Sequence, residues 1–419
     1  MSRSYQIVYD PVYGQISVPS FLSPLLNSPE LKRLSSIRLL NYESIQLAAL
    51  SEVRRLSHTL GVMHLGTRIR TIDFDSTEIN ALLCAILLHD IGTPPFGHTV
   101  EYEFVRRYRI NHEQIASNIL DASHHPLAED HQIYEGQAPQ LSKVISSLGI
   151  EETVRSILAG NHPLSKYLFG DIDLDNIDNV FRMAHYLGFS VDHSTPVEIA
   201  SELIVDKNGD KFFPVAKKSL IESWMSAREQ SYRTILGVRM HRQNQAVFAR
   251  IVFEAIQLGL ISKFDWFLTD ERLNARLQRE SELSRYFVHL HRGVELYEVS
   301  LAFRSEVRMP RTVLLDHRDR ITQGLEHELN TLVYVSVESV GDVLTRRLRF
   351  FDTATSEPWS MGEPQPTYRL NVYVASPKVR GRLADAVGRQ FGHCAERSGW
   401  IIEPNSAGAT PARGGVVEF

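Results

Sequence analysis

The stretch ALLCAILLHDIGTPPFGH, residues 81–98, joins a strongly apolar segment to two polar residues. The apolar part, residues 81–88, is long enough for a buried helix but far shorter than the roughly 20 residues that cross a membrane. His89 and Asp90 follow it directly, and polar groups that leave an apolar helix need partners. Because divalent metals accept imidazole and carboxylate ligands together, this helix end is predicted to form part of a metal site, with Gly92 allowing the backbone to bend.

The residues around this stretch show helical periodicity. Apolar residues recur three and four positions apart, so residues 29–200 are predicted to form successive helices. The helix that contains the apolar stretch has N-cap chemistry at Asp75 and an early acidic residue at Glu78. It is expected to stop near Gly92, ahead of two prolines.

The pattern changes after residue 200. Asn208-Gly209 supplies the positive φ angles of a tight hairpin turn, so residues 201–205 and 211–215 are predicted to pair as a short β-ribbon. Helical periodicity resumes over residues 218–270. Three alternating segments predict strands and one amphipathic segment predicts a final helix, at residues 331–337, 347–351 and 368–375 and at residues 379–398.

The chain is therefore predicted to be mainly α-helical, with a small β-hairpin insertion and a smaller C-terminal α+β region. Residues 1–320 are expected to form the catalytic domain, with its helical core at residues 29–200. Residues 321–405 are expected to form the α+β region, and the Gly/Ala/Pro-rich residues 406–419 a flexible tail.

The charge and the cysteines limit the classes of function. The 419 residues carry 45 Lys+Arg against 50 Asp+Glu, a formal charge of -5, so the chain offers no global attraction to phosphate backbones or anionic lipid. Any nucleotide or nucleic acid would have to be held by a local basic site. Only two cysteines occur, and Cys84 lies in the apolar run, so a reducing, cytoplasmic compartment is expected. The N-terminal residues lack the apolar core of a signal peptide, and no membrane association is expected.

Two further polar positions complete a candidate ligand set. His58 lies 31 residues before His89 on a helix face with apolar residues, and Asp175 lies in the acidic run at residues 171–178. Two imidazoles and two carboxylates neutralise a dication and leave positions open for water and a phosphate oxygen. A lone histidine on an apolar face is more often a satisfied core residue, and an acidic run is by default a solvated helix start. Composition alone leaves open which of the four aspartates in the run binds metal.

Several short stretches occur in the order and at the spacing of a known family. They resemble the HD superfamily of phosphohydrolases, particularly the SAM-and-HD-domain deoxynucleoside triphosphate triphosphohydrolases and the bacterial dGTP triphosphohydrolases. The resemblance covers residues 9 to about 190 and implies an HD-domain helical bundle. The stretches that carry it are YDPVYGQIS at 9–17, LKRL at 31–34, RLSHTLGV at 55–62, LHDIG at 88–92, PFGH at 95–98, HEQ at 112–114, and DLDNID at 173–178 with Arg182, Leu187 and Gly188.

The resemblance implies a ligand set for one divalent metal ion, which can be Mg, Mn, Fe or Zn. Asp175 is chosen over the other aspartates of its run by its distance to Leu187-Gly188 in the family pattern. The implied metal ligands are His58, His89, Asp90 and Asp175.

The resemblance also implies residues that handle substrate. Arg55 matches an arginine that grips the phosphates, a role suited to a planar and permanently charged guanidinium. His98, Glu101 and His112 match a polar cluster beside the metal, in which His98 would donate a proton to the leaving oxygen. Glu101 and His112 would orient it. His112 has a second interpretation as a polar residue at a helix N-terminus, and a two-metal site with His98 and His112 as extra ligands is a further variant.

The chain departs from the triphosphohydrolase pattern at positions that read the substrate. It has Thr93 where the family usually carries another histidine, Asn176 for a phosphate-binding lysine, Asn179 for a tyrosine and Met183 for a sugar-contacting aspartate. The hydrolytic chemistry is therefore expected to persist with altered recognition of the substrate. Three arginines lie where the family supplies phosphate contacts, although ordinary surface arginines are an equal interpretation: Arg239, Arg242 and Arg250.

The leading expectation is hydrolysis of a nucleotide phosphate ester, first of all conversion of a deoxynucleoside triphosphate to nucleoside and tripolyphosphate. A nuclease on single-stranded DNA or RNA is the alternative, supported by the basic run RRLR at residues 346–349 and opposed by the net charge. That run also reads as the solvated face of an edge strand. A third hypothesis is a nucleotide-sensing protein whose activity has decayed. Family members commonly assemble, so a homo-oligomer is expected.

Overall fold

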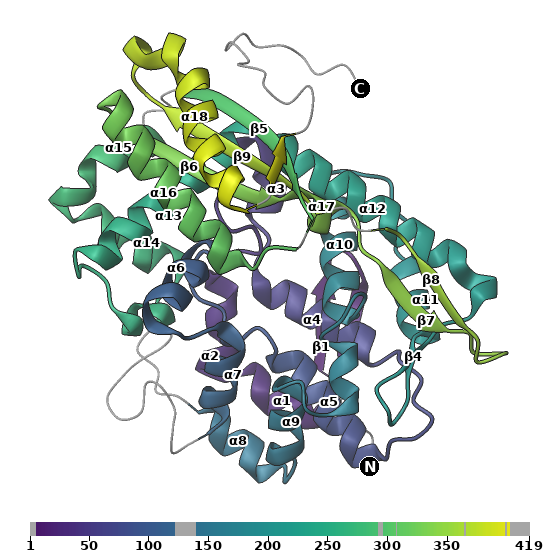
Figure 1. Cartoon of the computed structure of the whole chain (residues 1–419). Coiled ribbons are helices and arrows are strands. Elements are labelled where there is room, and N and C mark those ends of the chain that lie inside the picture. The colour runs from purple at the N-terminus through teal and green to yellow at the C-terminus, as the bar shows by residue number, and fades with distance from the viewer. Residues whose placement is uncertain are drawn as a thin grey trace. The chain divides into compact units, whose positions relative to one another are not determined.

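The fold is described from a computed structural model of the chain (Figure 1). The described residues are 6–121, 140–291, 296–306, 308–363, 366–398 and 400–402. The chain divides into two compact units, each assembled from segments that are distant in the sequence. Unit 1 contains Met1–Gly237, Ile261–Arg276 and Arg346–Glu363, and unit 2 contains Val238–Leu260, Leu277–Thr345 and Pro364–Phe419. The tail predicted at residues 406–419 lies outside the described residues, and the division predicted near residue 320 stays a prediction.

The described chain is mainly α-helical, which confirms the predicted fold class. Among its described helices, none combines the length and the apolar character that crossing a bilayer requires. The helices of unit 1 are α1 (Ser23–Leu26), α2 (Pro29–Arg33), α3 (Ala48–Ser51), α4 (Arg55–Gly66), α5 (Ser76–Leu88), α6 (His98–Tyr108), α7 (His112–Leu120), α8 (Leu141–Ser147), α9 (Glu151–Leu158), α10 (Leu174–Tyr186), α11 (Thr195–Glu202) and α12 (Lys218–Gly237), and α14 (Asp270–Gln278) begins in it.

Helices α4, α5 and α10 form the centre of unit 1, since α4 packs against both of the others. Asp75 and Glu78 close a reciprocal capping box at the start of α5, as the sequence predicts. Residues 81–88 of that helix are all buried. Gly61 lets α4 approach α10 closely, because a Cβ atom there would lie 2.0 Å from Oδ1 of Asp178.

Helix α5 ends at Leu88, and turns carry the chain on through Gly92. The chain bends here as expected, but Gly92 does not take a positive φ. A Cβ atom at this position would instead lie 2.0 Å from the carbonyl oxygen of His112. Gly92 is therefore required for the close approach of α7 to the loop after α5.

Unit 1 also contains two small sheets. The predicted β-ribbon forms, with Gly209 at φ 81°, but it is shorter than expected because residues 201–202 still belong to α11. Its second strand pairs in parallel with the predicted strand near residue 350 through Phe212 and Phe351. The strands are β1 (Gln6–Asp10) and β2 (Gly14–Val18) in one hairpin, and β3 (Ile204–Val205), β4 (Lys211–Phe212), β7 (Leu348–Phe351) and β8 (Pro358–Met361) in a sheet of that order.

Unit 2 is built on a four-stranded antiparallel sheet. Helices α16 (Arg311–Leu329) and α18 (Arg380–Ser398) pack against each other and share its apolar core, in which Phe303 and Phe391 are fully buried. The sheet order is β10 (Trp400–Ile402), β5 (Tyr297–Ser305), β9 (Thr367–Val374) and β6 (Val333–Ser339), and the other helices are α13 (Arg239–Gln257), α15 (Ser284–His291) and α17 (Val340–Leu344). The strands near residues 335 and 371 and the last helix were predicted, whereas β5, β10 and α16 were not.

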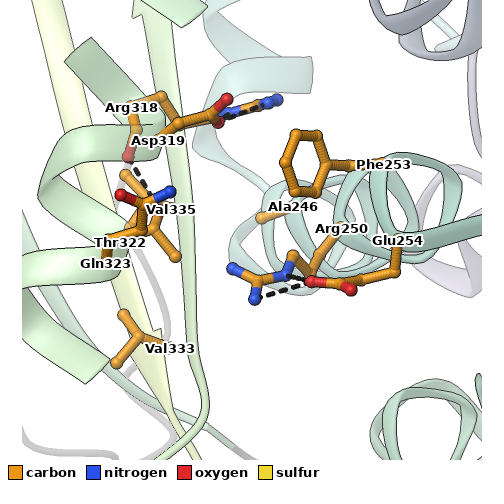
Figure 2. A pocket seen from close by; sticks show the side chains of 10 residues that line it. All are labelled: Ala246, Arg250, Phe253, Glu254, Arg318, Asp319, Thr322, Gln323, Val333 and Val335. Carbon is orange, nitrogen blue, oxygen red and sulfur yellow. Dashed lines mark hydrogen bonds and ion pairs between the residues drawn. The ribbon is translucent and has the colours of Figure 1, made fainter. Parts of the chain in front are cut away.

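A small cavity lies within unit 2, between α13, α16 and β6 (Figure 2). Its volume is about 150 Å³, below the range of roughly 300 to 1,000 Å³ that small-molecule sites occupy. The Arg250 guanidinium on its wall is paired with Glu254 at 2.8 Å and with Glu326 at 3.2 Å. Arg318, the second arginine on the wall, is paired with Asp319 at 2.7 Å. The cavity is thus too small for a nucleotide, and both of its arginines are already paired with carboxylates.

Candidate metal centre

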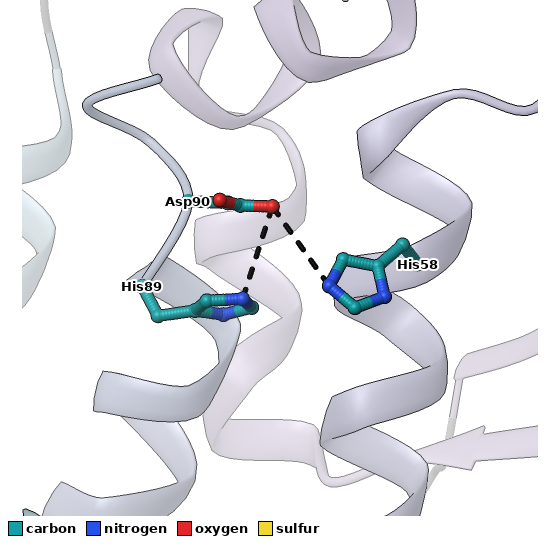
Figure 3. A group of neighbouring side chains, drawn as sticks. All are labelled: His58, His89 and Asp90. Atoms are coloured by element: carbon teal, nitrogen blue, oxygen red, sulfur yellow. Dashed lines mark ion pairs between the residues drawn. The ribbon is translucent and has the colours of Figure 1, made fainter. Parts of the chain in front are cut away.

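Three of the predicted ligands meet where α4 passes the end of α5 (Figure 3). His58 projects from α4, while His89 and Asp90 lie just after the last residue of α5. Oδ2 of Asp90 lies 3.8 Å from Nε2 of His89 and 3.9 Å from Nε2 of His58. The ligand atoms of the three side chains all lie within 4.8 Å of one another, and all three residues are buried.

The fourth predicted ligand reaches the same place from α10. Oδ1 of Asp175 lies 2.8 Å from Nε2 of His58 and 3.9 Å from Nε2 of His89. Its side chain is 37% exposed, against 7% or less for the other three, so the cluster opens toward solvent on the Asp175 side. The structure therefore brings together all four side chains that the sequence singles out, including the chosen aspartate of the acidic run.

His89 supplies the test of whether a cation fits this cluster. Its Nδ1 lies 2.7 Å from the carbonyl oxygen of Ile86, and in the tautomer that donates a hydrogen bond to this oxygen the lone pair of Nε2 faces the cluster. That Nε2 atom is buried and has no hydrogen-bond partner among the described residues. An unsatisfied buried acceptor is costly, and a cation held by His58, His89, Asp90 and Asp175 would satisfy it.

His58 is held between two carboxylates. Its Nδ1 lies 2.7 Å from Oδ2 of Asp178, on the side of the ring away from Asp175. Burial alone lowers the pKa of His58, but its hydrogen bonds to Asp175 and Asp178 outweigh burial and raise that pKa to about 10. Asp178 accordingly fixes the ring orientation and presents Nε2 to the cluster, as second-shell carboxylates do for metal-binding histidines.

The Asp178 carboxylate belongs to a fully buried charged network. Arg182 donates to it from Nε at 2.9 Å and from Nη2 at 3.0 Å, and donates from Nη1 to Asp10 at 2.9 Å. Burial raises the pKa of Asp178, but the Arg182 charge and the His58 hydrogen bond lower it to about 2. Asp178 and Asp10 were not predicted to have a role; the signal available in the sequence was the i, i+4 spacing of Asp178 and Arg182 on one helix face.

The loop after α5 is held by further residues for which no role was predicted. Arg33 donates to the carbonyl oxygens of Ile91 at 3.1 Å and Thr93 at 2.5 Å. The Trp266 indole donates to the carbonyl of Gly92 at 2.6 Å, and Asp270 accepts from the amide of Phe96 at 2.7 Å. Because both Arg33 and Asp270 are buried, the loop that carries His89 and Asp90 is fixed on several sides.

Arg55 links the metal cluster to the loop that follows it. Its Nη1 lies 2.9 Å from both carboxylate oxygens of Asp90, and both side chains are buried. A Cβ atom at Gly97, which has φ +50°, would lie 3.1 Å from Nη2 of Arg55. The guanidinium therefore extends from the cluster to the residue that precedes His98, the first residue of α6.

His98, Glu101 and His112 come together as a second polar cluster. Nδ1 of His98 lies 2.7 Å from Oε2 of Glu101, and Nδ1 of His112 lies 2.6 Å from Oε1. Burial raises the pKa of Glu101, but the hydrogen bonds to both imidazoles hold it well below its usual range. Burial lowers the pKa of His112, and its hydrogen bond to Glu101 reverses the shift so that the pKa is raised. With both Nδ1 atoms bound to Glu101, each ring keeps Nε2 for proton transfer.

Replacing Glu101 with glutamine is expected to reduce stability by about 2 kcal/mol, with most of the loss between about pH 4.5 and 6.5. The lowered pKa of Glu101 contributes stability above its unfolded-state value, and the raised pKa of His112 contributes below its own. Both contributions are fully present only in that window, and the second fades as pH rises past the raised pKa of His112. Thermal unfolding from about pH 5 to 9 measures this, with exposed Glu222→Gln as the control. A loss of equal size at every pH would contradict it.

The positions that depart from the family pattern have local partners. Thr93 is buried, and its hydroxyl donates to Oδ1 of Asp90 at 2.9 Å. Asn176 donates to the Asp173 N-cap, and Met183 is buried. The three arginines with two open interpretations are ion-paired: Arg239 and Arg242 with Glu298, and Arg250 with Glu254 and Glu326.

A family model matches the part of the chain that holds this geometry. Residues 55–183 match the family model described as HD domain. The match begins at Arg55 and contains all eight predicted site residues, so the chain carries an HD domain and its resemblance to the HD superfamily is confirmed.

Two relatives show how far the sequence similarity extends. The chain is 24% identical over 263 residues to the uncharacterized protein YwfO of Bacillus subtilis, covering 60% of this chain and 56% of that protein. It is 24% identical over 208 residues to the deoxynucleoside triphosphate triphosphohydrolase SAMHD1 homolog of Dictyostelium discoideum, covering 45% of this chain and 38% of that protein. The matched region is thus only about half, or less, of the length of these relatives.

The fold is shared with a solved structure. A phosphohydrolase from Bacteroides thetaiotaomicron superimposes with a TM-score of 0.63 at 17% identity, covering 88% of this chain and all 100% of that chain. At this level of identity the likeness concerns the fold alone, and it extends well beyond the HD domain.

Proposed function

We propose that this chain, which carries an HD domain over residues 55–183, is a metal-dependent phosphohydrolase that acts on nucleotides. The observation that carries the proposal is the convergence of His58, His89, Asp90 and Asp175. The buried Nε2 atom of His89, which has no hydrogen-bond partner in the described part of the chain, faces the other three. A divalent cation held there would supply Lewis acidity for attack of water on phosphorus. One carboxylate ligand, Asp175, lies on the more exposed side, which leaves an approach for substrate.

The residues around the cluster are suited to bind the phosphate and to donate the proton. Arg55 is buried, fixed by Asp90 and permanently charged, so it is suited to hold a phosphate beside the metal ligands. His98 has a side chain that is 47% exposed and oriented by Glu101, which suits it to give a proton to a leaving oxygen. His112 and Glu101 keep that ring in place.

The substrate that we propose first is a deoxynucleoside triphosphate. Water would add to the α-phosphorus, the bond from phosphorus to the 5′ oxygen would break, and the 5′ oxygen would take a proton from His98. A proton released from the water restores His98, and the products are nucleoside and tripolyphosphate. The triphosphohydrolase name of the Dictyostelium relative supports this class, whereas Asn176 and Met183 mean that a phosphate and the sugar would be bound differently.

Purified protein is expected to hydrolyse at least one of the four deoxynucleoside triphosphates, with activity lost in EDTA and restored by Mg²⁺, Mn²⁺, Fe²⁺ or Zn²⁺. Release of nucleoside and tripolyphosphate, followed by anion-exchange chromatography, measures this. Elemental analysis is expected to give one metal equivalent per chain; two would favour the variant in which His98 and His112 also bind an ion.

The control for this assay is a variant that lacks one proposed ligand and is purified in parallel. Equal turnover in both preparations would point to a contaminant. Nucleotide binding without turnover under any metal would contradict the proposed hydrolysis and favour a nucleotide-sensing protein.

A further inference from the structure

A cleft in unit 1 lies outside the metal cluster and has a volume of about 660 Å³. It forms where the 3-10 helix at Pro163–Tyr167 and the segment before α10 meet the β3–β4 turn and the β7–β8 hairpin. All of these segments belong to one compact unit. The cleft is therefore a feature of the same body that carries the HD domain.

The cleft concentrates positive charge. Its lining includes the cations Lys166, Lys211, Arg347 and Arg349, against the two acids Asp171 and Asp210. Three of the cations, Lys166, Arg347 and Arg349, are exposed. A chain with a formal charge of -5 thus has a local excess of positive charge, which is what binding of a phosphate backbone requires.

Aromatic side chains lie among these cations. Arg347, Arg349 and Phe351 alternate along the β7 segment and so share one face of the sheet. The β7–β8 hairpin is tied to the segment after β4, because the Trp359 indole donates to the carbonyl of Phe213 at 3.1 Å. Sites that hold single-stranded nucleic acid commonly combine aromatic side chains, on which bases stack, with cations that contact the phosphates.

Phe169 extends this arrangement toward the polar cluster. It lines the basic cleft and also a second groove of about 540 Å³ along α7 and α9, whose lining includes Asn111 and Glu113. These two residues flank His112 in the sequence. The two hollows therefore share Phe169 as a lining residue.

We propose that this basic cleft binds single-stranded nucleic acid, with phosphates on its lysines and arginines and a base stacked on Phe169. A free nucleotide favours a concave pocket that buries most of its surface, whereas these cations lie exposed at an open cleft. A polymer gains from several weak phosphate contacts in a row, which the spread of cations over three segments allows. The inference does not depend on hydrolysis at the metal cluster.

Fluorescence anisotropy with an internally labelled circular oligothymidylate in EDTA tests the proposal, because a circle has no end to enter the metal cluster and EDTA prevents hydrolysis. The wild-type chain is expected to bind with salt-dependent affinity. Arg347→Ala combined with Arg349→Ala is expected to weaken binding about tenfold and to reduce the slope of log K against log salt by about 1.4. Phe169→Ala is expected to weaken binding about tenfold, and Phe169→Tyr to restore it.

The matched control removes two exposed arginines outside the cleft, Arg233→Ala with Arg279→Ala, and is expected to bind as the wild type does. Circular dichroism establishes that each variant is folded. Absence of binding by the wild type would overturn the proposal, and so would equal weakening in the control. Displacement by dGTP at the same concentration of nucleotide units as oligothymidylate would also overturn it, because the cleft would then take free nucleotides.

Discussion

A His89→Asn variant is expected to lose the bound metal and at least about 1,000-fold in turnover, while remaining folded. Removing one ligand of a catalytic cation forfeits several kcal/mol of transition-state stabilisation, and roughly 4 kcal/mol corresponds to that factor. Asparagine is chosen because its amide nitrogen can take the place of Nδ1 and still donate to the carbonyl of Ile86. The substitution therefore deletes the Nε2 atom and keeps the local hydrogen bond.

Three measurements separate this effect from misfolding. Elemental analysis and turnover report the loss of metal and of activity, and thermal unfolding reports the fold. The wild type is expected to gain about 2.7 kcal/mol of stability when the free metal concentration is 100 times its dissociation constant, and the variant to gain almost none. His185→Asn, at a half-buried histidine away from the cluster, is the control and should behave as the wild type. Unchanged metal content and turnover in His89→Asn would remove His89 from the proposed ligand set.

The predicted metal ligands lie in short local patterns of the sequence, although the choice of Asp175 within its acidic run came from the family resemblance. His89 and Asp90 follow an apolar helix, and Asp175 lies in the first turn of a helix whose N-cap is Asp173. Their convergence could be expected only through the family resemblance, since no local pattern brings α4, α5 and α10 together. What brings α4 and α10 together is close packing at Gly61, where even one methyl group would collide with Asp178.

The elements that escaped prediction are those whose partners are distant in the sequence. Strand β5 alternates between buried and more exposed residues, but its neighbours in the sheet, β9 and β10, follow it by more than 60 residues. The local sequence does not reveal which faces will be covered, so a strand inside an otherwise helical region is easily missed. The same holds for Arg33 and Asp270, whose partners in the loop after α5 lie about 60 and 170 residues away.

Asp178→Asn is expected to reduce the free energy of unfolding by about 3 to 5 kcal/mol. The Arg182 guanidinium is fully buried, and two of its three hydrogen bonds to carboxylates go to Asp178. Removing the negative charge of Asp178 leaves the buried Arg182 cation with one of these two carboxylate partners, Asp10. Chemical denaturation of the metal-free protein measures the loss without a contribution from bound cation.

A double-mutant cycle separates the charge pair from simple loss of packing. Arg182→Met is expected to cost a similar amount, because it strands the Asp178 carboxylate, whereas the double variant should be more stable than the sum of the two single losses predicts. Strict additivity would mean that the 2.9 and 3.0 Å contacts between the two side chains contribute little to folding.

The same variant also reports on the metal cluster, because Asp178 holds Nδ1 of His58 at 2.7 Å. Loss of a carboxylate behind a metal-binding histidine typically costs 10- to 100-fold in metal affinity. Asp178→Asn is thus expected to weaken metal binding by this factor under conditions where the protein is still fully folded, as measured by competition with a chelating dye. Arg182→Met keeps the carboxylate in contact with His58 and is expected to weaken metal binding less. Equal effects of the two variants on affinity would mean that Asp178 acts only through stability and does not position the imidazole.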